Sequence, residues 1–238
     1  MKTLEDKAAV AAQLSKGIFN QFKELPPNVM LFKEDGVYNL FFDEMQTPQH
    51  KNEIQFITIL IAMWLGEVDA IAFNCESWAM QVSEKHTPEL WAEFNGQHNK
   101  IIDHVLDKYG SVGESPYKVE CLTTCIDDGK QGGVSQAQIT RFGESIDISK
   151  PDFQIGSDAE YKPDPRHKFN ALLLKTNAMT AMMTEVLPKL MGKSDVDKLV
   201  LTTFKDRFYI DMDVDKVLTK AKRVFKLIQN GRTEVKVH

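Results

Sequence analysis

Residues 72–81, AFNCESWAMQ, place a carboxylate in the middle of a predicted β-strand. Glu76 lies among apolar neighbours, two positions before Trp78. A carboxylate that is half-buried beside an indole costs free energy unless it is paired. Three roles for Glu76 are therefore open: half of a cross-strand ion pair, part of a polar ligand or partner surface, and a general acid or base.

Two later predicted strands carry charges that can face Glu76. They span residues 117–126, with Glu120, and residues 134–142, with Arg141. An arginine can bind a carboxylate through two parallel hydrogen bonds. The sequence therefore predicts either a Glu76–Arg141 pair or a Glu120–Arg141 pair across the sheet.

Side-chain alternation along the first strand groups the even-numbered residues on one face. With the arginine from the later strand, they form a candidate ligand or partner face of four residues: Asn74, Glu76, Trp78 and Arg141. No second carboxylate lies at a helpful spacing, and no histidine lies in register with Glu76. The ion pair is therefore the leading interpretation of this face.

The sequence predicts no metal and no cofactor. The acidic string DMDVD resembles the start of a calcium loop, but that loop requires Gly at 216 and Glu at 222, where this chain has lysine. Asp213 is better explained as the N-cap of a helix. His98 and His104 lie six residues apart and do not share a helix face.

The three cysteines, Cys75, Cys121 and Cys125, form no CxxC pair. We predict that they are buried as small apolar side chains, with a metal-binding cluster as the open alternative. Their low and odd number favours a reducing, cytoplasmic location. Consistent with this, the first 17 residues contain early acids and no signal-like apolar segment.

Catalytic sequence motifs are scarce in this chain. It contains no GxSxG, no P-loop, no HExxH and no glycine-rich dinucleotide turn. The sequence therefore leans against an enzyme.

The elements that must position these residues follow an α-β-β-α-β-(α)-β-β order. Pro26-Pro27 ends a first helix over residues 4–25, and an Asp-Gly turn joins strands 28–33 and 37–42. Thr47 caps a strongly apolar helix over 49–65. Its most apolar run, residues 54–66, spans only 13 residues and is too short to cross a bilayer. We predict an α+β domain with a mixed or antiparallel sheet and helices on one face, followed by a basic helical module.

Residues 143–166 are polar, are interrupted by prolines and lack periodicity, which is typical of a linker. The predicted organisation is an α+β domain at 1–150, a linker at 151–166 and a helical module at 167–238. Within the module, helices are expected over 167–191, 195–208 and 214–229.

Charge divides unevenly along the chain. Residues 1–165 contain 14 Lys/Arg and 26 Asp/Glu, a net charge of −12, whereas residues 166–238 contain 15 and 8, a net charge of +7. The basic surface comprises Lys216, Lys220, Lys222, Arg223, Lys226 and Arg232. It can pack against the acidic part of this chain or of a second copy, track phosphates of a nucleic acid, or face solvent.

Residues 26–145 resemble a group of uncharacterised proteins from bacteriophages and bacteria. Their strand reads Ser-Glu-Ala-Trp-Met, and here it reads Cys75-Glu76-Ser77-Trp78, with Met80 displaced by one position. A later motif of proline, a charged residue and glutamate corresponds here to Pro116, Lys118 and Glu120. The resemblance implies a phage-type origin and a small α+β domain, and it implies no reaction.

Three functions are consistent with these observations. The leading prediction is a non-enzymatic, phage-encoded interaction protein that binds a protein partner or associates with itself. The alternatives are a nucleic-acid-binding protein that uses the basic C-terminal helices, and a small-molecule enzyme that uses the Glu76/Trp78/Arg141 face. We expect the host cytoplasm as its location, with virion association open, and no membrane.

Overall fold

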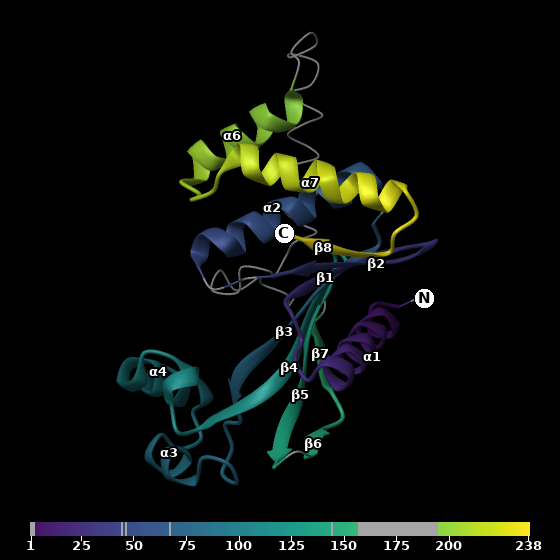
Figure 1. Ribbon diagram of the computed structural model, residues 1–238. Helices are drawn as coiled ribbons and strands as arrows, with labels where there is room; N and C mark the ends of the chain where they lie inside the picture. The colour runs from purple at the N-terminus through teal and green to yellow at the C-terminus, as the bar shows by residue number, and fades with distance from the viewer. Residues whose placement is uncertain (1–2, 44, 46, 67, 144, 157–194) are drawn as a thin grey trace. The chain divides into compact units, whose positions relative to one another are not determined.

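A computed structural model describes residues 3–43, 45, 47–66, 68–143, 145–156 and 195–238. The helices are α1 (Leu4–Phe22), α2 (Pro48–Leu65), α3 (Pro88–Glu93), α4 (His98–Tyr109), α6 (Val196–Phe208) and α7 (Val214–Gln229), with a 3-10 turn η1 (Val112–Glu114). The strands are β1 (Asn28–Lys33), β2 (Gly36–Phe42), β3 (Ala70–Met80), β4 (Lys118–Asp127), β5 (Gly132–Phe142), β6 (Ser145–Ile148), β7 (Asp152–Gly156) and β8 (Glu234–Val237) (Figure 1).

The eight described strands form a mixed sheet, which confirms the predicted α+β class. Their order is β6-β5-β4-β3-β1-β2-β8, with β7 paired to β5. The β1–β2, β1–β3 and β5–β6 pairs are antiparallel, whereas β8 runs parallel to β2. The predicted Asp-Gly hairpin thus forms, and β8 is a strand that the sequence reading did not predict.

The chain forms two compact units, and four strands, β3, β4, β5 and β7, contribute residues to both. Unit 1 comprises Met1–Cys75, Thr124–Ser135 and Phe153–His238, and unit 2 comprises Glu76–Thr123 and Gln136–Asp152. Residues 195–238, the described part of the predicted helical module, belong to unit 1. Strand β7 lies within the predicted linker, and residues 157–194 lie outside the described residues. The predicted division at 151–166 therefore stays a prediction.

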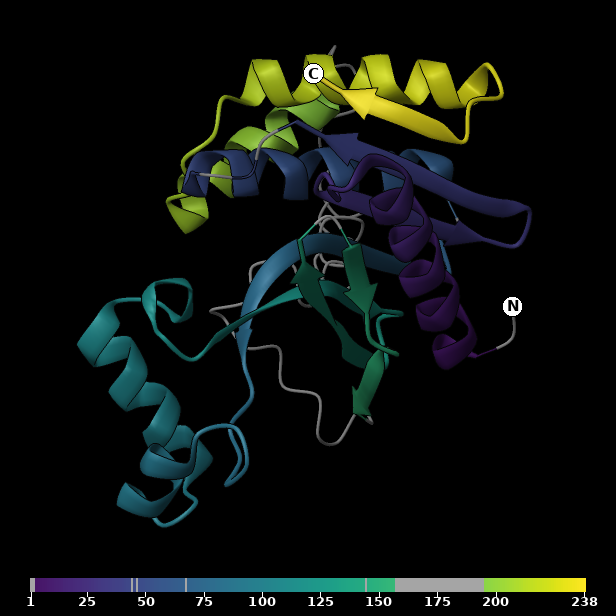
Figure 2. The ribbon, with the colours of Figure 1, turned by 60° about the horizontal axis from the view of Figure 1, so that its bottom comes forward.

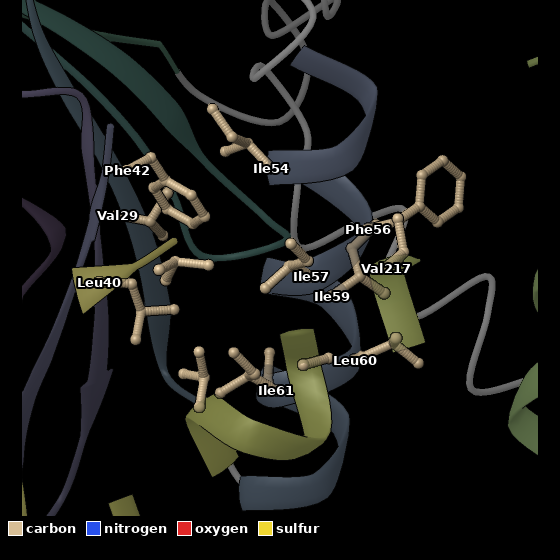
Figure 3. Packing of buried hydrophobic residues seen from close by; sticks show 14 of the residues in the cluster. Val29, Leu40, Phe42, Ile54, Phe56, Ile57, Ile59, Leu60, Ile61 and Val217 are labelled. Atoms are coloured by element: carbon tan, nitrogen blue, oxygen red, sulfur yellow. The ribbon is translucent and has the colours of Figure 1, made fainter. Parts of the chain in front are cut away.

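In unit 1, helix α2 is buried over every residue from Glu53 to Ala62. An α-helix that is apolar all round requires cover on all sides. Ile54, Ile57 and Ile61 point toward β1 and β2, whereas Phe56 lies on the side of Val217 of α7 (Figure 3). Helix α2 is therefore a central layer between the sheet and α7, as its apolar sequence predicts.

Helices cover both faces of the sheet in unit 1, where the sequence predicted one face. Along β1, Val29 and Leu31 pack in the cluster with α2, whereas Met30 and Phe32 pack in a second cluster with α1 (Figure 2). Alternate side chains point to opposite faces of a strand, so both faces of β1 are apolar. The run VMLF, residues 29–32, is continuously apolar for that reason.

Local signals place the ends of the unit 1 helices. Thr47 accepts a hydrogen bond from the backbone N–H of His50 at 3.1 Å, and Pro48 occupies the first turn of α2. Asp213 accepts one from the backbone N–H of Lys216 at 3.0 Å and caps α7. Both caps confirm the sequence prediction.

Unit 2 contains a small core of its own around Leu90, Ile101 and Val105. These residues come from α3 and α4, the two teal helices that lie together in Figure 1. The predicted break between these helices occurs at Asn95 and Gly96, which have φ angles of 50° and 71°. A Cβ at Gly96 would lie 2.9 Å from the Trp91 ring. Glycine is therefore favoured at position 96 for two reasons: it adopts the left-handed backbone conformation, and it leaves room for the indole of Trp91.

Candidate functional site

The candidate site lies in unit 2 and is built on an arginine–carboxylate pair. Arg141 of β5 donates from Nε to Glu120 Oε2 at 2.8 Å and from Nη2 to Glu120 Oε1 at 2.6 Å. This is the two-bond geometry that an arginine and a carboxylate favour. Of the two predicted pairs, the Glu120–Arg141 pair is confirmed. The strand order explains the choice, because β4 lies between β3 and β5.

Glu76 of β3 contributes to the same cluster. The hydrogen bonds from Arg141 lower the pKa of Glu120, burial opposes this, and a side-chain hydrogen bond with Glu76 lowers it further. The hydrogen bonds to Glu120 raise the pKa of Arg141, as does the charge of Glu76. The three side chains therefore form one electrostatic group across three neighbouring strands.

Trp78, two residues after Glu76 on β3, packs against Lys118 and η1, although 51% of it is exposed. Lys118 Nζ lies 4.7 Å from the centre of the indole and donates to the carbonyl oxygen of Gly113 at 2.7 Å. A Cβ at Gly113 would lie only 2.9 Å from Cδ1 of Trp78. The indole is thus in contact with the η1 backbone and with a lysine ammonium.

We call Glu76, Trp78, Lys118, Glu120 and Arg141 the Trp78 face. The sequence reading named Lys118 only within a motif and did not predict Gly113 at all. The alternation of side chains along β4 could have predicted Lys118, because it lies two residues before Glu120 and therefore on the same face. Gly113 lies in η1 outside the strands, where no periodicity marks it.

Asn74 does not belong to this face, and its prediction as a ligand residue is corrected. It is fully buried in unit 1. Its Nδ2 donates to Asn28 Oδ1 at 3.0 Å, and its Oδ1 accepts from Thr124 Oγ1 at 2.7 Å. Buried polar groups are stabilised by such mutual bonding, and these bonds occupy the side chain of Asn74.

The predicted basic surface divides into paired and exposed side chains. Lys216 and Lys220 lie 3.0 and 3.9 Å from carboxylate oxygens of Glu53, and Lys222 lies 3.8 Å from Asp195. The remaining side chains are exposed on α7 and after it: Arg223, Lys226 and Arg232. Half of the basic surface therefore faces acids of its own chain.

The cysteines of β4 have the chemistry of buried thiols. Burial raises the pKa of Cys125 to about 11, and burial also raises the pKa of Cys121. A thiol rather than a thiolate is a poor nucleophile and a poor metal ligand. Within the described ranges, no group of three or more His, Cys, Asp or Glu side chains is placed to hold a metal ion.

Comparisons with protein-family models, with curated proteins and with solved structures found no match to this chain. Among the helices that the structure describes, none combines the length and the apolar character needed to cross a membrane.

The lowered pKa of Glu120 predicts how its pair with Arg141 depends on pH. A carboxyl whose pKa falls on folding stabilises the folded state above its ordinary value of 4.5, and loses that contribution as pH falls through the lowered pKa. We expect Glu120→Gln to be less stable than the parent at pH 7 and to approach it below about pH 4. Urea unfolding between pH 3 and 7 measures this, and a gap that stays constant would contradict it.

Proposed function

We propose that this protein is a non-enzymatic interaction protein that binds a protein partner or a second copy of itself through the Trp78 face. The observation that carries the proposal is the half-exposed indole of Trp78, held by Lys118 and by the Gly113 backbone. Tryptophan and arginine are the side chains most enriched among residues that dominate binding energy. An anchor that is already ordered loses little conformational entropy on binding.

The charge state of Glu120 favours a binding role over an acid–base role for that carboxylate. A general acid or base at neutral pH needs a carboxyl whose pKa is raised toward 7. The pKa of Glu120 is lowered instead, and both its oxygens accept from Arg141. The pair therefore supports a fixed, charged surface more than an acid–base site.

Nucleic-acid binding by the C-terminal helices has less support from the geometry. Phosphate binding depends on the number of cations free to neutralise phosphates. Three of the six predicted basic residues, Lys216, Lys220 and Lys222, lie within 4 Å of carboxylates of this chain. The interaction function is therefore preferred, and a phage origin and a cytoplasmic location are proposed with it from the sequence resemblance and the cysteine content.

Replacing Trp78 with alanine is expected to weaken partner binding. Truncation of a dominant interface residue costs about 2 kcal/mol or more, a loss of roughly 30-fold in affinity. Two measurements cover the two kinds of partner: sedimentation velocity of the purified chain over a range of concentrations, and quantitative co-purification from cells that express it.

A matched control is Tyr209→Ala in unit 1, because Tyr209 is 96% exposed. We expect Tyr209→Ala to leave both self-association and the set of co-purifying proteins unchanged. Trp78→Ala is expected to abolish self-association or to remove a co-purifying protein. Circular dichroism establishes that both variants are folded. The proposal fails if Trp78→Ala and the parent give the same sedimentation profile and the same co-purifying proteins.

A further inference from the structure

Unit 1 contains a cavity of about 230 Å³ between α2, α7 and the ends of β2 and β8. Its polar lining comprises Asp43, His50, Glu53, Lys216, Lys220 and His238. Clefts in which charged side chains converge on an apolar base are the usual form of small-molecule sites. The cavity and the Trp78 face share no residues, and each has its own charged side chains.

Glu53 is the most buried charge in the cavity, with 5% of its side chain exposed. Lys216 Nζ donates to its Oε1 at 3.0 Å, and Lys220 Nζ lies 3.9 Å from its Oε2. One carboxylate thus faces two ammonium groups. This triad carries a net charge of +1.

The two ammonium groups have more donors than Glu53 can accept. Each lysine carries three N–H donors and no acceptor. In the described part of the chain, Lys216 donates one hydrogen bond to Glu53, whereas Lys220, at 3.9 Å, makes an ion-pair contact with it. The spare N–H groups therefore favour an oxygen-rich, negatively charged ligand over a cation.

The second carboxylate of the lining is already engaged. Asp43 Oδ2 lies 2.8 Å from Nδ1 of His238. This contact leaves the lysine side of the cavity as the strongest site for a negative charge. The imidazole of His238, which lines the same cavity, reports on anything that enters it.

The apolar side chains of the cavity indicate what the ligand carries besides its negatively charged group. Phe42, Ile54, Ile57 and Val237 are the apolar lining residues of the cavity, and they present only small edges to it because each is at least 95% buried. We propose that this cavity binds a small organic anion, a carboxylate or a phosphate monoester with an apolar group, whose anionic oxygens accept from Lys216 and Lys220. The apolar group packs against Phe42 and the isoleucines of α2. This function lies beyond the proposed protein–protein interaction and does not depend on it.

The test uses the full chain and three probes: phenylphosphate, benzoate and inorganic phosphate. Nuclear magnetic resonance of the imidazole signals and titration calorimetry measure binding. We expect phenylphosphate or benzoate to shift the His50 and His238 signals, with a dissociation constant below about 1 mM. Comparison of the two organic probes shows whether the site prefers a phosphate or a carboxylate head group, and inorganic phosphate is expected to bind more weakly than either.

The matched variants are Lys220→Met and Lys226→Met, both on α7. Only Lys220 lines the cavity, and its replacement leaves the 3.0 Å bond between Lys216 and Glu53 in place. Lys220→Met removes one charged donor to the anion and is expected to weaken binding about tenfold or more. Lys226→Met is expected to bind as the parent does.

Three outcomes would overturn the proposal. The first is an absence of imidazole shifts with phenylphosphate and benzoate at millimolar concentration in the parent chain. The second is equal affinity in the two lysine variants. The third is inorganic phosphate binding as tightly as phenylphosphate, because the apolar base would then contribute nothing.

Discussion

Replacing both Lys216 and Lys220 with methionine is expected to lower the free energy of unfolding of unit 1 by about 3–5 kcal/mol. Both lysines face the carboxylate of Glu53, which is almost completely buried. Without them, a negative charge remains in the interior with no compensating cation. Desolvation of an unpaired charge is what makes a broken buried pair costly.

Replacing the glutamate instead of the lysines is expected to lower the free energy of unfolding much less. In Glu53→Gln the two lysines lose their partner, but 45% and 27% of their side chains are exposed, so water solvates them. Combining Glu53→Leu with the two methionines removes all three charges and is expected to recover most of the lost stability. The expected order is therefore asymmetric: loss of the lysines costs more than loss of the glutamate.

Hydrogen exchange of the amides in α2 and α7 measures this effect within unit 1. Arg223→Met with Lys226→Met is the control, since both side chains are exposed on α7. Surface substitutions of this kind change stability by about 0.5 kcal/mol or less each. An equal loss in the control and in the Lys216/Lys220 variant would show that the Glu53 pairing contributes nothing.

Replacing Asn74 with alanine is expected to destabilise unit 1 by about 2–5 kcal/mol. The side chain joins three neighbouring strands, because it donates to Asn28 of β1 and accepts from Thr124 of β4. Its removal leaves two buried polar groups without their partner. Each such group costs about 1–3 kcal/mol.

A graded series tests this network. Thr124→Val removes one donor and leaves the Asn74–Asn28 bond, so it is expected to cost about 1–3 kcal/mol. Asn28→Leu combined with Asn74→Leu removes both amides and is expected to cost less than the sum of the two single changes. Guanidinium unfolding provides the values, and strict additivity would contradict a shared network.

The sequence by itself determined the local elements of this protein. The Asp-Gly hairpin, the Thr47 and Asp213 caps and the break at Asn95–Gly96 each depend on atoms within a few residues along the chain. The strongly apolar run at residues 54–65 of α2 likewise predicted the burial of that part of the helix. These signals suffice for the α+β class.

Only the tertiary structure decided how the chemistry-bearing side chains combine. Alternation placed Asn74, Glu76 and Trp78 on one face of β3, but it does not report depth: Asn74 is fully buried and bonded to Asn28 and Thr124, whereas 51% of Trp78 is exposed. The partner of Arg141 depended on the strand order. Glu53 pairs with lysines of α7 that lie more than 160 residues later in the chain. Contacts between distant segments leave no periodic trace in either segment, and for that reason the cavity beside Glu53 and the contact of Trp78 with Gly113 emerged only from the fold.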